Sequence, residues 1–326
     1  MLFPLGMKAH TVIALVIILW VPLLALAQGT QGDWLDELES FSRDLFEAYA
    51  PEDIKAEYRI PTARELRQFL DRAQRALYDG DADELAALAP YACESLDILS
   101  RIPGGSDYAS WLQARLDFFL AAEQAQPKPS PRTGAPPAEA SNGSRPAPRL
   151  PAPLTREPFW KHRISQRPAP PAAAELIPAI KTVFADNGIP PELTWMAEVE
   201  SSLNPSARSP AGAVGLFQFM PATARRFGLK TAPVDERRDP LKSADAAARY
   251  LRLLYGRFES WPLALAAYNA GEGRVGRALK RHRKTDFESV APYLPTESRM
   301  YVPKVLATIH AREQVHPDDI PGPKEL

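Results

Sequence analysis

The chain of 326 residues is long enough for two ordinary domains, and its 45% hydrophobic and 24% charged residues are typical of a globular protein. The net charge of −1 conceals a division, because residues 29–125 sum to −11 and residues 156–313 to +8. A single cysteine, Cys93, excludes an internal disulfide, so the fold must be stabilised by its core; we expect Cys93 itself to be a small buried hydrophobe.

Residues 1–27 form a predicted signal peptide. Lys8 and His10 precede an apolar run that begins at Thr11 and ends in Ala-Leu-Ala at residue 27. This order is typical of a cleaved export signal. The alternative is an uncleaved anchor, because the run is near the lower limit of about 17 residues for a membrane span. Both interpretations predict a periplasmic or otherwise extracytoplasmic protein and argue against nucleic acid as a partner.

Residues 28–125 are predicted to form an acidic helical accessory domain. One helix face is marked by apolar residues at helical spacing, namely Leu66, Phe69, Leu70, Ala73 and Leu77. A second run from Tyr108 to Leu120 repeats the pattern, and no strand pattern interrupts it. Nothing in this region suggests chemistry. It remains open whether the bundle binds the wall or a protein partner.

Residues 126–158 are predicted to be a disordered linker. Prolines, of which the chain has 34, are concentrated there among Ala, Ser, Gly and Arg. Such a composition buries too little apolar surface to offset the entropy of ordering, so we expect an extended, mobile tether. A short polar tail, residues 316–326, ends the chain.

Residues 159–315 are predicted to form a second, mainly α domain. Helices are expected at residues 172–187, 190–201, 221–227, 240–258, 261–269 and 297–313. Their boundaries carry consistent signals, because Gly188 follows the first helix and Pro191 opens the second.

Glu200 is the strongest candidate for chemistry. It follows Leu193, Met196 and Ala197 at positions i+7, i+4 and i+3 of one helix face, so it shares the apolar side. Glu198 lies roughly 160° away and should meet solvent or the opposite side, so the two cannot act as a pair. Burial raises the pKa of a carboxyl group, which can then donate a proton near neutral pH. The alternative is a glutamate that caps backbone amides.

Four motifs follow one another in this region: VESSLNP with Glu200, GLFQFMP, AAYNAG and YLPTESRMYVPKVLA. Gly212 and Gly215, in the loop after Glu200, would let the backbone approach a ligand closely. With these motifs, residues from about Pro190 to Ala311 resemble the catalytic domain of family 1 lytic transglycosylases, in the branch around membrane-bound lytic transglycosylase D. The resemblance implies a lysozyme-like fold of the goose-type class.

The resemblance also implies roles for single residues. Glu200 matches the catalytic acid/base of the family, and the substrate-binding positions are matched by Ser209, Gln218, Met220, Tyr268, Asn269 and Tyr301. Tyr301 matches the tyrosine that hydrogen-bonds near the acid. Each of three residues also has a structural interpretation: Gln218 could satisfy loop backbone, Asn269 could end a helix, and Tyr301 could be a core residue.

The implied reaction is cleavage of the β-1,4 bond between MurNAc and GlcNAc in peptidoglycan glycan strands, which forms 1,6-anhydro-muramic acid ends. The muramic acid 6-hydroxyl attacks its own anomeric carbon, so one carboxyl acid is sufficient, whereas ordinary glycosidases use two. We expect no cofactor and no metal. The alternatives are a lysozyme-type hydrolase on the same fold and a non-catalytic wall-binding protein.

Three further patterns are discounted as sites. Residues 271–276 satisfy GxGxxG but follow a helix instead of a strand, which argues against a nucleotide site. The five histidines show no metal-ligand spacing. The basic run at residues 279–286 is expected to be a solvated helix face, with attraction of anionic wall polymer as the alternative.

Overall fold

The computed structural model describes residues 63–101, 105–125 and 150–325, and the predicted signal peptide or anchor at residues 1–27 lies outside these ranges. So do the first part of the predicted accessory domain and most of the predicted linker. Within the described ranges the chain forms helices and two isolated β-bridges but no strand, which confirms the mainly α prediction. None of the helices described there has the length and apolar character needed to cross a membrane.

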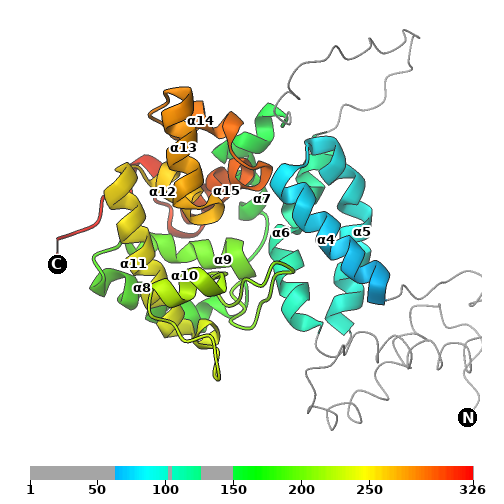
Figure 1. The fold of residues 1–326 in the computed structure, drawn as a ribbon, viewed down its shortest axis with the longest axis horizontal. Coiled ribbons are helices and arrows are strands. Elements are labelled where there is room, and N and C mark those ends of the chain that lie inside the picture. Colours follow the sequence, from blue (N-terminus) through cyan, green and yellow to red (C-terminus); the bar gives the residue numbers. More distant parts are fainter. Residues whose placement is uncertain (1–62, 102–104, 126–149, 326) are drawn as a thin grey trace, which may run out of the picture.

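Three N-terminal helices lie side by side along one flank of the molecule: α4 (Ala63–Asp79), α5 (Ala82–Arg101) and α6 (Ser106–Gln124) (Figure 1). The apolar face predicted for α4 is buried at Leu66, Leu70 and Leu77. Cys93 of α5 is exposed, contrary to the expectation of a buried hydrophobe. The preceding Ala92 lies on the buried face of the helix, and Cys93 lies outside that face.

The C-terminal part begins with η2 (Ala152–Thr155), α7 (Glu157–Ser165) and α8 (Ala173–Asp186). It continues with η3 (Pro191–Trp195), α9 (Met196–Ser201), α10 (Pro221–Arg226), η4 (Glu236–Arg238), α11 (Pro240–Phe258) and α12 (Trp261–Ala270). The last elements are α13 (Glu272–His282), α14 (Phe287–Val290), η5 (Ala291–Tyr293), α15 (Thr296–Glu313) and η6 (Pro317–Asp319). The six helices predicted in this part are all present, although the second is divided into η3 and α9.

Capping residues explain where several of these helices begin. Asp239 accepts hydrogen bonds from the backbone amides of Leu241 and Lys242 at the start of α11. Ser260 accepts one from Leu263 at the start of α12, and a proline follows in the first turn of both helices. Helix α9 ends after six residues because Ser202 and Leu203 adopt left-handed backbone conformations.

Residues 150–158 differ from the predicted linker, because they contain η2 and the start of α7. Leu154 is fully buried, and its carbonyl accepts a hydrogen bond of 2.8 Å from the indole nitrogen of Trp160. The fixed φ of proline is compatible with a 3₁₀ turn, so proline-rich composition does not prevent order where a leucine can reach the core.

Helix α15 is the central element of the core, since its side chains from Thr296 to Ile309 are buried. It packs against α7, α9 and α12 of the C-terminal part and also against α4. Helix α6 packs against α9 in the same way. One continuous hydrophobic core therefore includes residues of α4, α5 and α6 together with those of the C-terminal helices.

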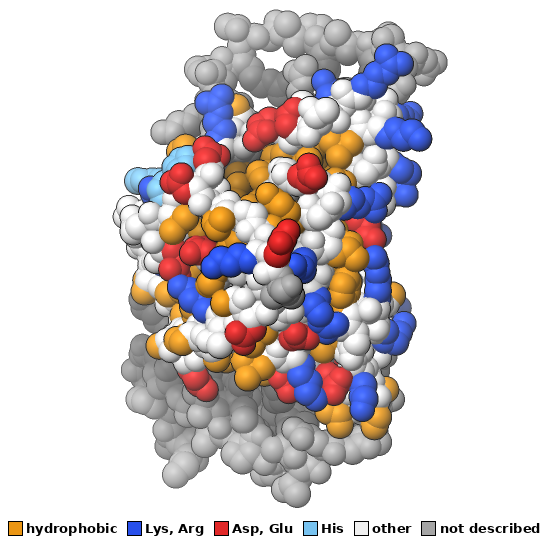
Figure 2. Space-filling model, turned by 90° about the vertical axis from the view of Figure 1, so that its left-hand side faces the viewer, with side chains coloured by type: hydrophobic (Ala, Val, Ile, Leu, Met, Phe, Trp, Pro, Cys, Tyr) orange, Lys and Arg blue, Asp and Glu red, His pale blue; other side chains and the backbone are white. Residues whose placement is uncertain are grey.

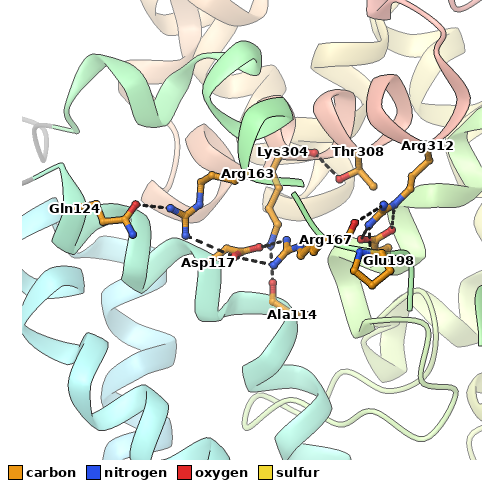
Figure 3. Close-up of polar contacts among 10 residues, drawn as sticks. Ala114, Asp117, Gln124, Arg163, Arg167, Glu198, Lys304, Thr308 and Arg312 are labelled. Carbon is orange, nitrogen blue, oxygen red and sulfur yellow. Dashed lines mark hydrogen bonds and ion pairs between the residues drawn. The ribbon is translucent and has the colours of Figure 1, made fainter. Parts of the chain in front are cut away.

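Polar contacts also connect α6 to the C-terminal helices, as Figure 3 shows. The carboxylate of Asp117 lies 3.1 Å from the Lys304 ammonium and forms a hydrogen-bonded ion pair with Arg167. Arg163 lies 3.8 Å from the same carboxylate. We call these four residues the Asp117 cluster. Because Lys304 also donates a 2.7 Å hydrogen bond to the carbonyl of Ala114, α6 is fixed on α15 at two points.

Candidate active site

A cavity of about 310 Å³ lies where α6, α9, α12 and the loop at residues 202–220 meet. Six of the seven residues predicted from motifs line it: Glu200, Ser209, Gln218, Met220, Tyr268 and Asn269. Tyr301 does not line it. The structure thus brings together residues that are up to 69 positions apart in the sequence.

Glu200 stands on the last turn of α9 and is 3% exposed, although it borders the cavity. Leu193, Met196 and Ala197 on the same face are fully buried, as the helical spacing predicts. Glu198 points to the other side of the helix and forms an ion pair of 2.8 Å with Arg312. The two carboxylates are therefore separated by the helix, and Glu200 alone faces the cavity from α9.

The pKa of the Glu200 carboxyl is raised to about 7, chiefly by burial, which disfavours the charged form. The Arg115 guanidinium acts in the opposite direction, and the negative charge of Glu297 adds to the rise. A carboxyl group with this pKa carries a proton in a large fraction of molecules at neutral pH. It can therefore serve as a general acid.

Two tyrosines adjoin this carboxyl group. Tyr301 of α15 is 1% exposed, and its hydroxyl lowers the Glu200 pKa, yet it lies outside strict hydrogen-bond geometry with any described residue. Tyr268 of α12 donates a 2.9 Å hydrogen bond to the carbonyl of Phe217. Burial raises the pKa of both hydroxyls well above the usual value, so both are neutral. Both tyrosines thus lie beside the Glu200 carboxyl group, but only Tyr268 also lines the cavity.

The loop at residues 202–220 carries Ser209 and Gln218 into the cavity wall. The Ser209 hydroxyl accepts a 2.9 Å hydrogen bond from the amide of Ala213. The Gln218 amide nitrogen donates to the carbonyls of Ala207 and Gly215, so this group satisfies loop backbone. The Gln218 Oε1 atom has no hydrogen-bond partner among the described residues. The amide nitrogen of Gln218 therefore has a structural role, whereas its Oε1 atom remains an unused hydrogen-bond acceptor beside the cavity.

Arg237, which no motif indicated, fixes this loop. Its guanidinium donates hydrogen bonds to the carbonyls of Gly212 and Phe219 and pairs with Asp235. A Cβ atom on Gly215 would lie 1.9 Å from the carbonyl oxygen of Arg237, and the φ of Gly215 is +90°. Gly215 is thus required for close packing against backbone, and not for the approach of a ligand as its sequence context suggested.

Asn269 and Met220 complete the set predicted from motifs. Asn269, near the end of α12, accepts a hydrogen bond from the hydroxyl of Ser298 on α15. Its side chain is therefore fixed by a neighbouring helix, and α12 ends one residue later with Gly271 as its C-cap, as the alternative interpretation of these residues predicted. Met220 is 42% exposed at the cavity rim, where an apolar side chain in water can pack against a ligand.

Eleven lining residues were not predicted as site residues, and four of these lie on α4, α6 and α15. Gln74 comes from α4, Trp111 and Arg115 from α6, and Glu297 from α15. Arg115 stands four positions after Trp111, so both lie on one helix face. The available signal was Arg115 as the one basic residue of α6, on the same face as Trp111.

The basic run at residues 279–286 lies apart from the lining residues, at the end of α13 and in the turn after it. Arg281 and Arg283 are exposed, and His282 stacks on Tyr293 with ring centroids 3.6 Å apart. On the face shown in Figure 2, Lys and Arg side chains predominate along the upper right margin, while both signs alternate below. In the described ranges, no three His, Cys, Asp or Glu side chains gather closely enough to bind a metal.

Part of the chain is similar to known proteins. Residues 179–290 match the family model described as Transglycosylase SLT domain. The chain is 45% identical over 125 residues to the membrane-bound lytic murein transglycosylase D of Escherichia coli K12, which is 36% of this chain and 27% of that protein. It is 39% identical over 118 residues to the peptidoglycan transglycosylase gp16 of Escherichia phage T7, covering 35% of this chain and 9% of that protein.

The soluble lytic murein transglycosylase of Escherichia coli K12 is 36% identical over 123 residues, which are 34% of this chain and 19% of that protein. The chain thus spans less than a third of the length of these relatives. Among solved structures, the 70-kDa soluble lytic transglycosylase of Escherichia coli aligns with a TM-score of 0.37 at 19% identity, over 94% of this chain and 63% of that one. That value is too low to assign a fold.

Proposed function

The chain contains a Transglycosylase SLT domain, as its motifs predicted, and from this premise we propose that it is a lytic transglycosylase that cleaves peptidoglycan. The proposed bond is the β-1,4 linkage between MurNAc and GlcNAc, with 1,6-anhydro-muramic acid ends as the product. One observation carries the proposal. A single buried carboxyl group with a pKa of about 7, that of Glu200, borders a cavity lined by Gln218, Tyr268 and Asn269.

Glu200 acts first as a general acid. The glycosidic oxygen must gain a proton as its bond to the anomeric carbon breaks, and a protonated Glu200 donates it. The resulting carboxylate then accepts the proton of the muramic acid 6-hydroxyl as that oxygen attacks the anomeric carbon. The proton balance closes, because Glu200 ends the cycle protonated. No water is consumed.

An internal nucleophile explains why one acid is sufficient. A hydroxyl group held in a reactive geometry has an effective molarity of about 10⁵ M or more, so no second carboxylate is needed to activate water. Glu297 also borders the cavity, but its carboxylate lies 3.1 Å from the Arg115 guanidinium and is engaged in that ion pair. Glu297 is also the residue that favours the alternative, a lysozyme-type hydrolase, in which it would activate water as the base.

The substitution Glu200→Gln tests the proposal, since glutamine keeps the shape of the side chain but cannot donate the proton. We expect activity on purified sacculi to fall by at least about a hundredfold. Glu175→Gln, at an exposed residue of α8, is the matched control and should retain full activity. Unchanged clearing of the sacculi by Glu200→Gln would show that Glu200 is not the acid, and no clearing by the wild-type chain would indicate a binding protein.

Mass spectrometry of the digested glycan separates the two enzymatic outcomes. A lytic transglycosylase yields anhydro ends, whereas a hydrolase adds one water per cleavage and yields reducing ends. We expect the anhydro product in wild type. Reducing ends that disappear in Glu297→Gln would instead assign the hydrolase reaction.

We also propose that the chain acts outside the cytoplasm, on wall glycan strands. The apolar run at residues 11–27 supports this, together with the +8 charge of residues 156–313, which suits a polymer bearing carboxylates. N-terminal sequencing of the protein from a periplasmic fraction tests it. A mature chain that begins near Gln28 is the expected result.

A further inference from the structure

Helix α6 lies outside the segment that matches the family model, yet one of its side chains contacts the candidate acid. Arg115 is 6% exposed. Its Nη1 atom donates a 2.9 Å hydrogen bond to the carbonyl of Glu200, and its Nη2 atom lies 3.5 Å from Oε2 of that residue. Its Nε atom lies 3.1 Å from Oε1 of Glu297. One guanidinium therefore joins α6, α9 and α15 at the cavity.

This guanidinium occupies a fixed position. It lies over the Trp111 ring, 5.3 Å from the centroid, one helical turn earlier on α6. Two residues after Arg115, the Asp117 cluster anchors α6 to α15, as Figure 3 shows. The loop after α9 is also connected to α6, because the Asn204 amide donates a 2.6 Å hydrogen bond to Ser110. The position of Arg115 relative to Glu200 is thus determined from several sides.

We propose that Arg115 is a positioning residue for Glu200, supplied by the N-terminal helices: it fixes the end of α9 and sets the charge of the acid jointly with Glu297. This inference rests on the proposed function. Arg115 does not contact the reacting bond in this role, and it acts through the carboxyl group and the backbone of Glu200.

The charges explain how this arrangement operates. Arg115 is shared between two carboxyl groups and lies closer to Glu297, at 3.1 Å, than to Oε2 of Glu200, at 3.5 Å. The closer Glu297 carboxylate therefore offsets much of the positive charge, and burial keeps Glu200 protonated. After Glu200 has donated its proton, the same guanidinium stabilises the new carboxylate. The other groups that face Glu200, Tyr268 of α12 and Tyr301 of α15, are neutral.

The test is the pH dependence of kcat/KM for Arg115→Met, Arg115→Lys and Glu297→Gln. Activity requires protonated Glu200, so it declines as pH rises through the Glu200 pKa. Loss of Arg115 removes an interaction that lowers this pKa, and the decline should move to higher pH by about one unit. Loss of Glu297 removes one that raises it, so the decline should move to lower pH. Arg115→Lys keeps the charge and should stay near wild type.

A merely structural role for Arg115 would not produce shifts of opposite sign. The matched control is Arg238→Gln, which removes the 3.0 Å ion pair with Asp107 at the other end of α6 and should leave the pH profile unchanged. Unshifted profiles, or shifts in the same direction for Arg115→Met and Glu297→Gln, would overturn the inference. Should Arg115→Met fail to fold by circular dichroism, Glu297→Gln and Arg115→Lys still decide it.

The result also separates this inference from the proposed function. An inactive Glu200→Gln variant together with unshifted Arg115 and Glu297 profiles would refute only the positioning role. An active Glu200→Gln variant would refute the proposed acid itself.

Discussion

The carboxyl groups of Asp117 on α6 and Glu200 on α9 are both buried, but their pKa values are shifted in opposite directions. The pKa of Asp117 is well below its usual range, because Lys304 and Arg167 counteract the burial of the carboxylate. The pKa of Glu200 is raised to about 7, because burial outweighs a single cation at 3.5 Å that is shared with Glu297. Both groups are about equally inaccessible to water. The number of cations per carboxylate therefore decides which group is an anion and which is an acid.

Helix geometry allows α6 to serve both groups. Arg115 and Asp117 are two positions apart, which places them roughly 200° apart around the helix axis. One side of α6 thus supplies a cation to the cavity, and the opposite side supplies an anion to the core. The same helix anchors itself with one charge and acts on Glu200 with the other.

Removal of α4, α5 and α6 should have the largest effect on stability, because it removes Asp117 and also the Arg115 side chain that contacts Glu200. A chain of residues 150–326 lacks the buried Trp111, Phe118 and Phe119, each worth about 3–5 kcal/mol in a core. That sum matches or exceeds the entire stability of an ordinary domain. We expect no cooperative transition in urea and no near-UV circular dichroism signal. A sharp transition at the wild-type midpoint would show that the C-terminal helices fold alone.

Asp117→Asn should be the next most severe change, since it leaves Lys304 buried without its counter-ion. We expect a loss of about 3–5 kcal/mol in the free energy of unfolding at pH 7, measured in urea. Because the pKa of Asp117 is lowered in the fold, its contribution is present above pH about 4 and declines as pH falls further. Asp107→Asn, at a pair that is partly exposed, is the control and should cost less than about 1 kcal/mol.

Glu200→Gln should have the smallest effect on stability, and the opposite sign. The folded pKa is above the usual value of 4.5, so wild type loses stability as pH rises from about 4.5 to 7. Glutamine removes this dependence, and the variant should be more stable than wild type at pH 8 by up to about 3 kcal/mol. The two should be nearly equal at pH 4.5. Thermal melts at both pH values test this, and a variant that is less stable at pH 8 would contradict the burial of an acid.

The helical spacing around Glu200 was sufficient to predict which side of α9 it occupies, because apolar periodicity is a local property. The same spacing also placed Glu198 on the opposite side of the helix. Its partner Arg312 could not be predicted in this way, because it lies on a helix 114 positions away. Motif resemblance located Gln218 and Asn269, yet their hydrogen bonds to loop backbone and to Ser298 required the fold. Ranges of the six predicted helices agreed closely because proline, glycine and capping residues mark their ends.

Contacts between distant segments could not be predicted in this way. Arg115 is the one basic residue of α6, and nothing local shows that it meets Glu200, 85 positions later. The ion pair of the buried Lys304 was equally hidden from the sequence, since its partner Asp117 lies 187 positions earlier in the chain. A proline-rich composition also masked Leu154, which folds onto Trp160. Charges in apolar runs are thus worth examining as a class when a site is sought from sequence.

The bridging of three helices by Arg115 bears on how segments of this chain can be exchanged with those of its relatives. An exchange of segments between relatives at the borders of the family match, residues 179–290, would separate the guanidinium from Glu200, while Glu297 would stay with it. The chimera would combine the Arg115–Glu297 pair of one chain with the acid of another, even if every motif were intact. A graft that keeps the contact between Arg115 and Glu200 would have to carry the helix at residues 106–124 along with the segment that holds the motifs. The part to be transferred is therefore larger than the segment that matches the family model.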